Sequence, residues 1–294
     1  MNSFIAALLL VAAQPGAPAG TGSSPAVMLT EASLPTHTVY RPANLRAAGR
    51  LPLVVWGNGG CRNLGNSAQP FLTELASQGF LVIAAGVIGE IAPPRPPRTA
   101  ESPRPGAETG VWQPQVTTPA IIRAIDWAIA ENQRAGSPYR GRIDTGRIAV
   151  AGHSCGGLLA LDASRDPRVT TTMIMNSGAL NDGTHPVGVD ATKDSLPRLH
   201  GPVLYVTGGP SDVAHPNALD DVSRIGQVPV FLASRDVGHS GTYREANGGA
   251  YGRLASAWLR WRLKGDRSAA AAFSPTGEFG RDPSWSLSAR IPAR

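Results

Sequence analysis

Charged residues are scarce in this 294-residue chain: Asp, Glu, Lys and Arg together make up 16%, whereas hydrophobic residues make up 42%. No run of like charge exceeds a few positions, so a disordered, solvated chain is excluded for most of the length. Beyond the extreme N-terminus the sequence lacks any stretch of 18 or more apolar residues, which excludes a polytopic membrane protein. The apolar content is sufficient for one substantial core.

Lysine is also rare, occurring only at Lys193 and Lys264, although the formal net charge is +6. The arginines that supply this charge are scattered along the chain, and neither a basic helix nor a nucleic-acid-binding motif accompanies them. We therefore expect a solvated, arginine-rich surface and no nucleic-acid partner.

Cysteine is limited to two residues, Cys61 and Cys155. The chain has no second cysteine pair and no His-x-His spacing, and both absences argue against a metal site or a cysteine nucleophile. We expect the protein to need no metal and no organic cofactor.

The N-terminus carries a ten-residue apolar run from Phe4 to Ala13 that ends in small residues of the kind a signal peptidase reads. We expect residues 1–13 to be a signal peptide for secretion or export to the periplasm. The leader MNS contains neither Lys nor Arg, so a buried helix is the alternative. Residues 14–28 are predicted to be a flexible linker, and residues 29–265 one folded domain. Residues 266–294 are predicted to be a tail that packs on the domain or is partly disordered.

Short apolar runs alternate with helical patterns between these ends. This alternation predicts an α/β fold with a mostly parallel central sheet of about eight strands and helices on both faces. The predicted buried strands are Leu51–Trp56, Phe80–Ala85, Ile148–Gly152, Val169–Met175, Val203–Thr207 and Val228–Leu232, with edge strands at Val39–Tyr40 and Val27–Leu29. One helix is predicted to start at the N-cap and first-turn pair Thr118-Pro119. A second follows the helical spacing from Tyr251 to Leu259.

The strongest motif in the sequence is Gly152-His153-Ser154-Cys155-Gly156, a G-x-S-x-G pattern between a predicted strand and a predicted helix. The strand-to-helix turn must be sharp, and side chains at the two glycines would collide with the neighbouring elements. Such a strained turn lifts the serine hydroxyl clear of the sheet, and the helix N-terminus beneath it favours negative charge. The pattern therefore predicts that Ser154 is a nucleophile.

In these motifs the sequence resembles the α/β-hydrolase superfamily, and more narrowly the branch of serine esterases that includes dienelactone hydrolases, cutinases and polyester hydrolases. The resemblance spans roughly residues 36–265. It rests on LPLVVWGNGG (51–60), LASQGFLVIAAG (75–86), IDTGRIAVAGHSCGG (143–157), VLYVTGGPSD (203–212) and the segment around Gly238-His239. The resemblance implies an α/β-hydrolase fold, a catalytic domain over residues 29–265, and a nucleophile, acid and base in the order Ser, Asp, His.

A serine hydroxyl needs a neighbouring base, and the base needs a carboxylate that orients it. His239 follows the strand at Val228–Leu232, at the carboxyl edge where ligands bind in such sheets, and it matches the family position of the base. Asp212 lies just past the strand at Val203–Thr207, in the loop where the family carries its acid. Its rivals are Asp220 and Asp221 in a probable helix, which we expect to be solvated, and Asp236 near His239.

Two backbone N–H groups must stabilise the negative charge that develops on the substrate oxygen. We expect one from Cys155, and alignment with the family places the other at Cys61, with Gly60 as the alternative. Two donors that converge on one oxygen lie close enough for a Cys61–Cys155 disulfide. Two unbridged cysteines are the other possibility. Many relatives carry an aromatic residue where this chain has Cys61, and this difference argues against bulky aromatic polyesters as substrates.

The sequence therefore predicts a serine hydrolase that cleaves carboxylic esters, small or polymeric, through an acyl-enzyme intermediate. A peptidase or an acyltransferase would use the same three residues, and a binding protein on an inactive scaffold is the alternative outside enzymes. We favour a monomer. The proline-rich loop at residues 87–114 is expected to border the site, as an ordered lid or as a solvated flap.

Overall fold

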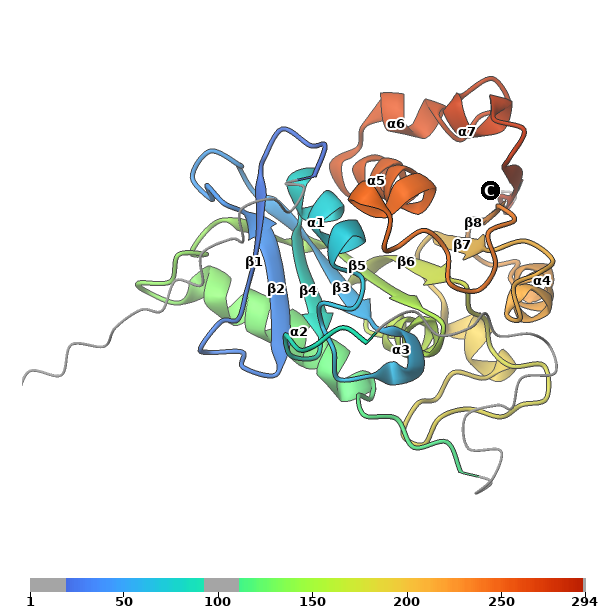
Figure 1. Ribbon diagram of the computed structural model, residues 1–294, viewed down its shortest axis with the longest axis horizontal. Coiled ribbons are helices and arrows are strands. Elements are labelled where there is room, and N and C mark those ends of the chain that lie inside the picture. Colours follow the sequence, from blue (N-terminus) through green and yellow to red (C-terminus); the bar gives the residue numbers. More distant parts are fainter. Residues whose placement is uncertain (1–19, 93–110, 293–294) are drawn as a thin grey trace, which may run out of the picture.

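The computed structural model describes residues 20–92 and 111–292 (Figure 1). The predicted signal peptide, the first part of the predicted linker and most of the predicted loop at residues 87–114 lie outside the described residues. The described residues form one sheet of nine strands in the order β1-β2-β4-β3-β5-β6-β7-β8-β9.

Six neighbouring strands of this sheet, from β4 to β8, run parallel, and antiparallel pairs flank them at both edges. The strands are β1 (Ala26–Leu29), β2 (His37–Pro42), β3 (Leu51–Gly57), β4 (Leu81–Ala85), β5 (Ile143–His153), β6 (Val169–Met175), β7 (Val203–Thr207), β8 (Val230–Ser234) and β9 (Ser286–Arg290). The mostly parallel α/β sheet is confirmed. The strand number is corrected from about eight to nine, and β2 lies between β1 and β4 instead of at an edge.

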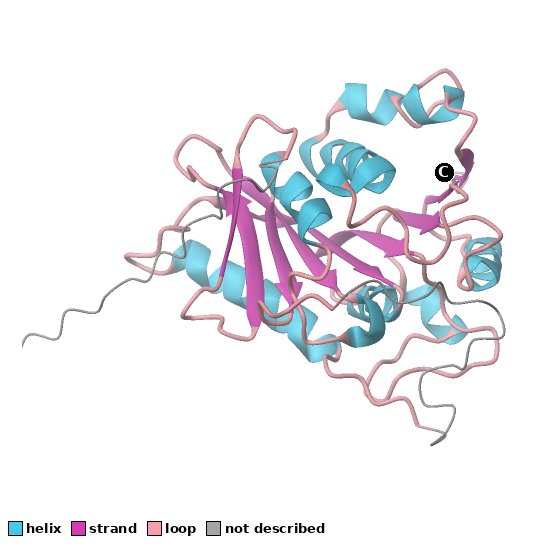
Figure 2. Ribbon diagram, in the orientation of Figure 1, coloured by secondary structure: helices cyan, strands magenta, loops and turns pink. Residues whose placement is uncertain are grey.

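Helices cover both faces of the sheet (Figure 2). They are α1 (Gln69–Ser77), α2 (Thr118–Gln133), α3 (Cys155–Ala163), α4 (His215–Arg224), α5 (Gly249–Lys264), α6 (Arg267–Ala271) and α7 (Glu278–Arg281), with 3₁₀ turns η1 (Gly59–Cys61), η2 (Lys193–Arg198) and η3 (Ala246–Gly248). Helix α2 begins at Thr118, but its N-cap is Thr117 and the Thr118 hydroxyl donates to the buried Asp162.

Two hydrophobic clusters separate along the pleat of the strands. In β3, Leu53 and Val55 pack into the cluster that contains the apolar faces of α2 and α3, whereas Val54 and Trp56 pack into the cluster beneath α1 and α5. All four side chains are fully buried. Alternation with a period of two on a sheet buried on both faces explains why this strand is a continuous apolar run.

The predicted linker at residues 14–28 ends inside the domain. Thr21 donates through its backbone N–H and its hydroxyl to the Glu74 carboxylate of α1, both at 2.6 Å. The Ser24 N–H donates to the Ser77 carbonyl at 3.1 Å. The part of this segment that the structure describes therefore belongs to the folded domain, and β1 already begins at Ala26.

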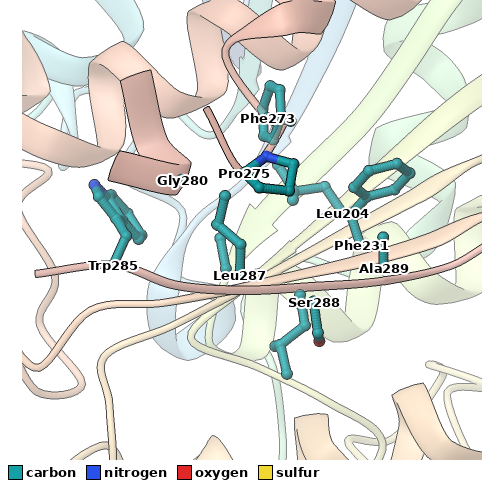
Figure 3. Close-up of a pocket in the computed structure, with 11 residues that line it drawn as sticks. Leu204, Phe231, Phe273, Pro275, Gly280, Trp285, Leu287, Ser288 and Ala289 are labelled. Atoms are coloured by element: carbon teal, nitrogen blue, oxygen red, sulfur yellow. The ribbon is translucent and has the colours of Figure 1, made fainter. Parts of the chain in front are cut away.

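The segment predicted as a tail, residues 266–294, adds α6, α7 and β9 to the domain, and β9 pairs antiparallel with β8. Phe273, Pro275 and Leu287 of this segment enclose an apolar cavity of about 320 Å³ against Phe231 of β8 and Leu204 of β7 (Figure 3). Phe279 and Trp285 of this segment are buried in the hydrophobic cluster beneath α1 and α5, which explains why the described part of the tail packs on the domain. The domain therefore extends past residue 265.

Candidate active site

Ser154 lies at the turn between β5 and α3, with φ 54° and ψ −123°. A non-glycine residue with positive φ is uncommon and strained, and such strain persists only where the surroundings fix it. The Ser154 N–H donates to the Met175 carbonyl of β6 at 2.9 Å, and the Ser177 hydroxyl donates to the Ser154 carbonyl at 2.6 Å. These bonds fix both sides of the strained residue.

Glycines allow the backbones around this turn to approach one another closely. A Cβ atom on Gly152 would lie 2.0 Å from the Gly156 carbonyl oxygen, and one on Gly156 would lie 2.0 Å from the Gly57 carbonyl oxygen of β3. Neither distance is possible for a real side chain, so both glycines of the G-x-S-x-G motif are sterically required. The sequence-based explanation of this motif is confirmed.

The strand order places Ser154, Asp212 and His239 at one edge of the sheet. They follow the carboxyl ends of β5, β7 and β8, which with β6 run parallel and adjacent. His239 Nε2 lies 2.9 Å from Ser154 Oγ, and His239 Nδ1 lies 2.7 Å from Asp212 Oδ1. We call these three hydrogen-bonded side chains the triad. All three lie where the sequence analysis expected a nucleophile, an acid and a base.

The triad fixes the tautomer of His239. A carboxylate accepts only, so the proton of the neutral imidazole lies on Nδ1 and the lone pair on Nε2 accepts from the Ser154 hydroxyl. This arrangement can move a proton from the hydroxyl to the imidazole.

Asp212 is 1% exposed and its two oxygens accept four hydrogen bonds. Besides His239, the donors are the N–H groups of Gly208 (2.9 Å) and Ala214 (2.9 Å) and the Asn176 amide (2.8 Å). Burial alone would raise the pKa of Asp212, but the bond and the charge of His239, with the two backbone donors, outweigh it and lower this pKa to about 2. Asp212 is therefore ionised at neutral pH.

His153, which immediately precedes Ser154, supports the backbone of His239. Its Nε2 lies 2.9 Å from the His239 carbonyl, which can only accept, so Nε2 carries the proton of His153. Its ring packs 4.7 Å from the ring of Tyr243 and 5.3 Å from that of His239. Burial, and then the neighbouring His239, lower the pKa of His153 to about 3, so this side chain is neutral at pH 7.

The structure contains a Cys61–Cys155 disulfide with a Cα–Cα distance of 5.2 Å. The predicted bridge is therefore confirmed, and it connects η1, in the loop after β3, to the first residue of α3. As that first residue, Cys155 has an N–H without an acceptor inside the helix. The Cys61 N–H donates to the Asn58 carbonyl at 3.0 Å, so in this turn the Gly60 N–H, one residue earlier, is the less engaged of the two predicted donors.

Sequence analysis missed Asn176, which follows β6 directly and bonds to Asp212. A polar residue at the carboxyl end of a buried strand is a signal that could have identified it. The rival acid Asp221 is fully buried and bonded to Lys193 and Tyr205, so the expectation that it is solvated is wrong. Asp236 accepts from the Ser211 hydroxyl instead.

Comparison with known proteins does not assign a family, since neither a protein-family model nor a curated protein matches the chain. In the described part of the chain, none of the helices is both long and apolar enough to cross a bilayer. Among the same residues, no three His, Cys, Asp or Glu side chains are grouped so that they could hold a metal ion. The apolar cavity at β7–β9 does not include the triad among its lining residues.

Proposed function

We propose that the protein is a serine hydrolase with an α/β-hydrolase fold that cleaves carboxylic esters. The observation that carries the proposal is the continuous hydrogen-bonded series from Ser154 Oγ through His239 to Asp212, at 2.9 and 2.7 Å. The strained serine at the junction of β5 and α3 supports the same fold. The resemblance to the branch of dienelactone hydrolases, cutinases and polyester hydrolases supports an ester as the substrate.

The proposed reaction has two halves. In the first, Ser154 Oγ attacks the acyl carbon while its proton moves to His239 Nε2, and His239 then gives that proton to the departing alcohol as the acyl–oxygen bond breaks. In the second, His239 takes a proton from water, the hydroxide adds to the acyl-enzyme, and the acid leaves as Ser154 recovers its proton. Asp212 stays ionised throughout and stabilises the imidazolium that forms in each half.

The negative charge on the tetrahedral intermediate requires donors beside Ser154. The Cys155 N–H lies at the N-terminus of α3, where the helix dipole adds a partial positive charge. The second donor comes from η1, through Gly60 or Cys61. Because the disulfide joins Cys61 to Cys155, it keeps the two halves of this oxyanion hole at a fixed separation before substrate arrives.

The same triad would serve a peptidase or an acyltransferase, and a binding protein could retain it without turnover. An ester is favoured over a peptide as the substrate because the motifs of this chain resemble those of a branch of serine esterases. Export to an oxidising compartment fits the disulfide.

The proposal is tested by turnover of p-nitrophenyl esters of increasing acyl length and by labelling with a fluorophosphonate. We expect wild-type protein to hydrolyse at least one ester and to label at Ser154, and Ser154→Ala to do neither while melting like the wild type. Ser223→Ala, which removes an exposed hydroxyl of α4, is the matched control and should behave like wild type. Full hydrolysis by Ser154→Ala, or an unlabelled and inactive wild type, would overturn the proposal.

A further inference from the structure

Asn176 lies between the nucleophile and the acid. It follows the last residue of β6, the strand between β5, which leads to Ser154, and β7, which leads to Asp212. Its backbone has φ 44°, in the left-handed region that asparagine tolerates better than most residues, and its side chain is fully buried. A buried primary amide at this position requires partners for both its nitrogen and its oxygen.

The contacts of the Asn176 amide reach both members of the acid–base pair. Its Nδ2 donates to Asp212 Oδ2 at 2.8 Å, and it also lies within bonding distance of the Gly238 carbonyl (3.2 Å) and the Tyr251 hydroxyl (3.3 Å). Gly238 immediately precedes His239. One amide group therefore contacts the acid directly and the base through the backbone beside it.

The orientation of this amide is determined by its neighbours. The Tyr243 hydroxyl donates to Asn176 Oδ1 at 2.6 Å. In the flipped orientation, the amide oxygen would face the Asp212 carboxylate and the Gly238 carbonyl, which have no proton to offer. Tyr243 therefore keeps the nitrogen of Asn176 turned toward Asp212.

Both oxygens of Asp212 then have fixed partners. His239 and the Ala214 N–H bond to Oδ1, while Asn176 and the Gly208 N–H bond to Oδ2. Without the Asn176 amide, Oδ2 keeps a single donor, and the carboxylate can rotate away from the line to His239 Nδ1. Misplacement of a supporting group by about 1 Å can cost a reaction on the order of 100-fold.

We propose that Asn176 is a positioning residue for the acid–base pair, and that Tyr243 fixes the amide of Asn176 in the productive orientation. The proposal rests on the proposed esterase function for its kinetic readout. It goes beyond that function because it assigns a role to two residues outside the triad.

Asn176→Gly is the main test, because glycine accepts the positive φ at this position and the variant lacks the amide together with its CH2 group. We expect kcat for a p-nitrophenyl ester to fall about 10- to 100-fold with little change in KM. The acid limb of the pH–rate profile should shift to lower pH, since the imidazolium loses part of its support. Tyr243→Phe keeps the Asn176 amide but removes the donor to its Oδ1, so the amide is held less firmly, and we expect a smaller loss, about 2- to 10-fold.

Tyr40→Phe is the matched control, since it also removes one buried hydroxyl, which bonds to the Gly65 carbonyl at 3.0 Å. It should leave kcat and the pH profile unchanged. A spectroscopic readout does not depend on turnover: the downfield proton resonance of His239 Nδ1–H should be present in the wild type and in Tyr40→Phe, and weakened or shifted in Asn176→Gly.

The outcomes separate this inference from the proposed function. An active wild type together with unaltered kcat, pH profile and Nδ1–H resonance in Asn176→Gly and Tyr243→Phe overturns the inference and leaves the esterase proposal standing. If the wild type neither hydrolyses esters nor reacts with fluorophosphonate, the proposed function is wrong. The Nδ1–H resonance then still decides whether Asn176 positions Asp212. If Asn176→Gly does not fold, Tyr243→Phe decides the question in the same way.

Discussion

Ser154 and the pair of Asp212 and His239 meet at one edge of the sheet but are fixed in place by different means. Around Ser154, backbone packs directly on backbone, with a disulfide from Cys61 to Cys155 beside it. Around Asp212 and His239, no covalent link is present in the described residues. Hydrogen bonds from Asn176 and His153 and from backbone N–H groups position these side chains instead.

This difference predicts which changes will disturb the structure of each region. Backbone packing without free volume is sensitive to the addition of a single carbon atom, and a disulfide is sensitive to reductant. A network of buried polar groups is sensitive to the loss of one donor and to pH. The two regions can therefore be disturbed separately.

The largest effect is expected from Gly156→Ala, in the turn that carries Ser154. The added Cβ would lie 2.0 Å from the Gly57 carbonyl oxygen, so β3 and α3 must separate. We expect a loss of about 4 kcal/mol or more in the free energy of unfolding, measured with urea. Gly146→Ala is the control, because its Cβ would have no neighbour closer than 3.8 Å. Equal stabilities of the two variants would show that packing at this turn is not tight.

Removal of the disulfide should have the next largest effect. The bridge joins residues 94 apart in sequence, and the Cys61→Ala, Cys155→Ala double variant should lose about 2–4 kcal/mol of unfolding free energy. Ester turnover should fall as well, because the two sides of the proposed oxyanion hole are no longer linked.

Reductant provides the control for this prediction. Treatment of the wild type should lower its stability and activity toward those of the double variant, and should leave the double variant unchanged. A reductant effect of equal size on both proteins would mean that the disulfide is not the cause.

Features of the fold and the site that depend on local sequence could be predicted, whereas features that depend on contacts formed on folding could not. The strands Val169–Met175 and Val203–Thr207 have the predicted bounds, because both are rich in the β-branched residues that favour strands, and all but one of their residues are buried. The ninth strand was missed. Ser286–Arg290 lies at an edge and is mostly exposed, so it carries no such run, and only its pairing with β8 defines it.

In the site, residues whose type is dictated by local geometry could be predicted. The G-x-S-x-G turn requires glycines at fixed offsets from Ser154. Cys155 follows Ser154 in this turn, and the disulfide joins it to Cys61 in the loop after β3. Asn176 and Tyr243 could not be predicted, because their roles depend on which loops meet after folding. Asp221 looked like a surface carboxylate until the fold placed Lys193 and Tyr205 beside it.

A pH effect of intermediate size is expected on the acid–base side, from His153. Its pKa is lowered to about 3 in the folded protein from 6.5, so the unfolded chain binds more protons than the folded protein between these pH values. Stability from this group is therefore present above pH 6.5 and is lost as pH falls toward 3. The loss between pH 7 and pH 4 should be roughly 3 kcal/mol. The contribution of Asp212, whose pKa is lowered from 3.8 to about 2, is lost later, as the pH falls from 3.8 toward 2.

Unfolding curves of wild type and His153→Gln between pH 7 and pH 4 would measure this effect. Glutamine offers an N–H donor but does not titrate, so the variant should show a shallower decline in stability with falling pH. His185→Gln, which removes an exposed histidine, should decline like wild type. Parallel curves for all three proteins would contradict the assignment of this pH dependence to His153.

The smallest effect is expected from Ser211→Ala, in the same loop as Asp212. The Ser211 hydroxyl donates to Asp236 at 2.7 Å, but both groups are open to solvent, so water replaces the lost bond. We expect the free energy of unfolding to change by less than about 0.5 kcal/mol and kcat to change less than about twofold. Ser211 and Asn176 both lie near Asp212, but only Asn176 is buried. Comparison of kcat in Ser211→Ala and Asn176→Gly therefore shows whether a hydrogen bond must be buried, and not only close to Asp212, to affect turnover. A tenfold loss of kcat in Ser211→Ala would mean that the whole loop, and not its buried donors, determines the position of Asp212.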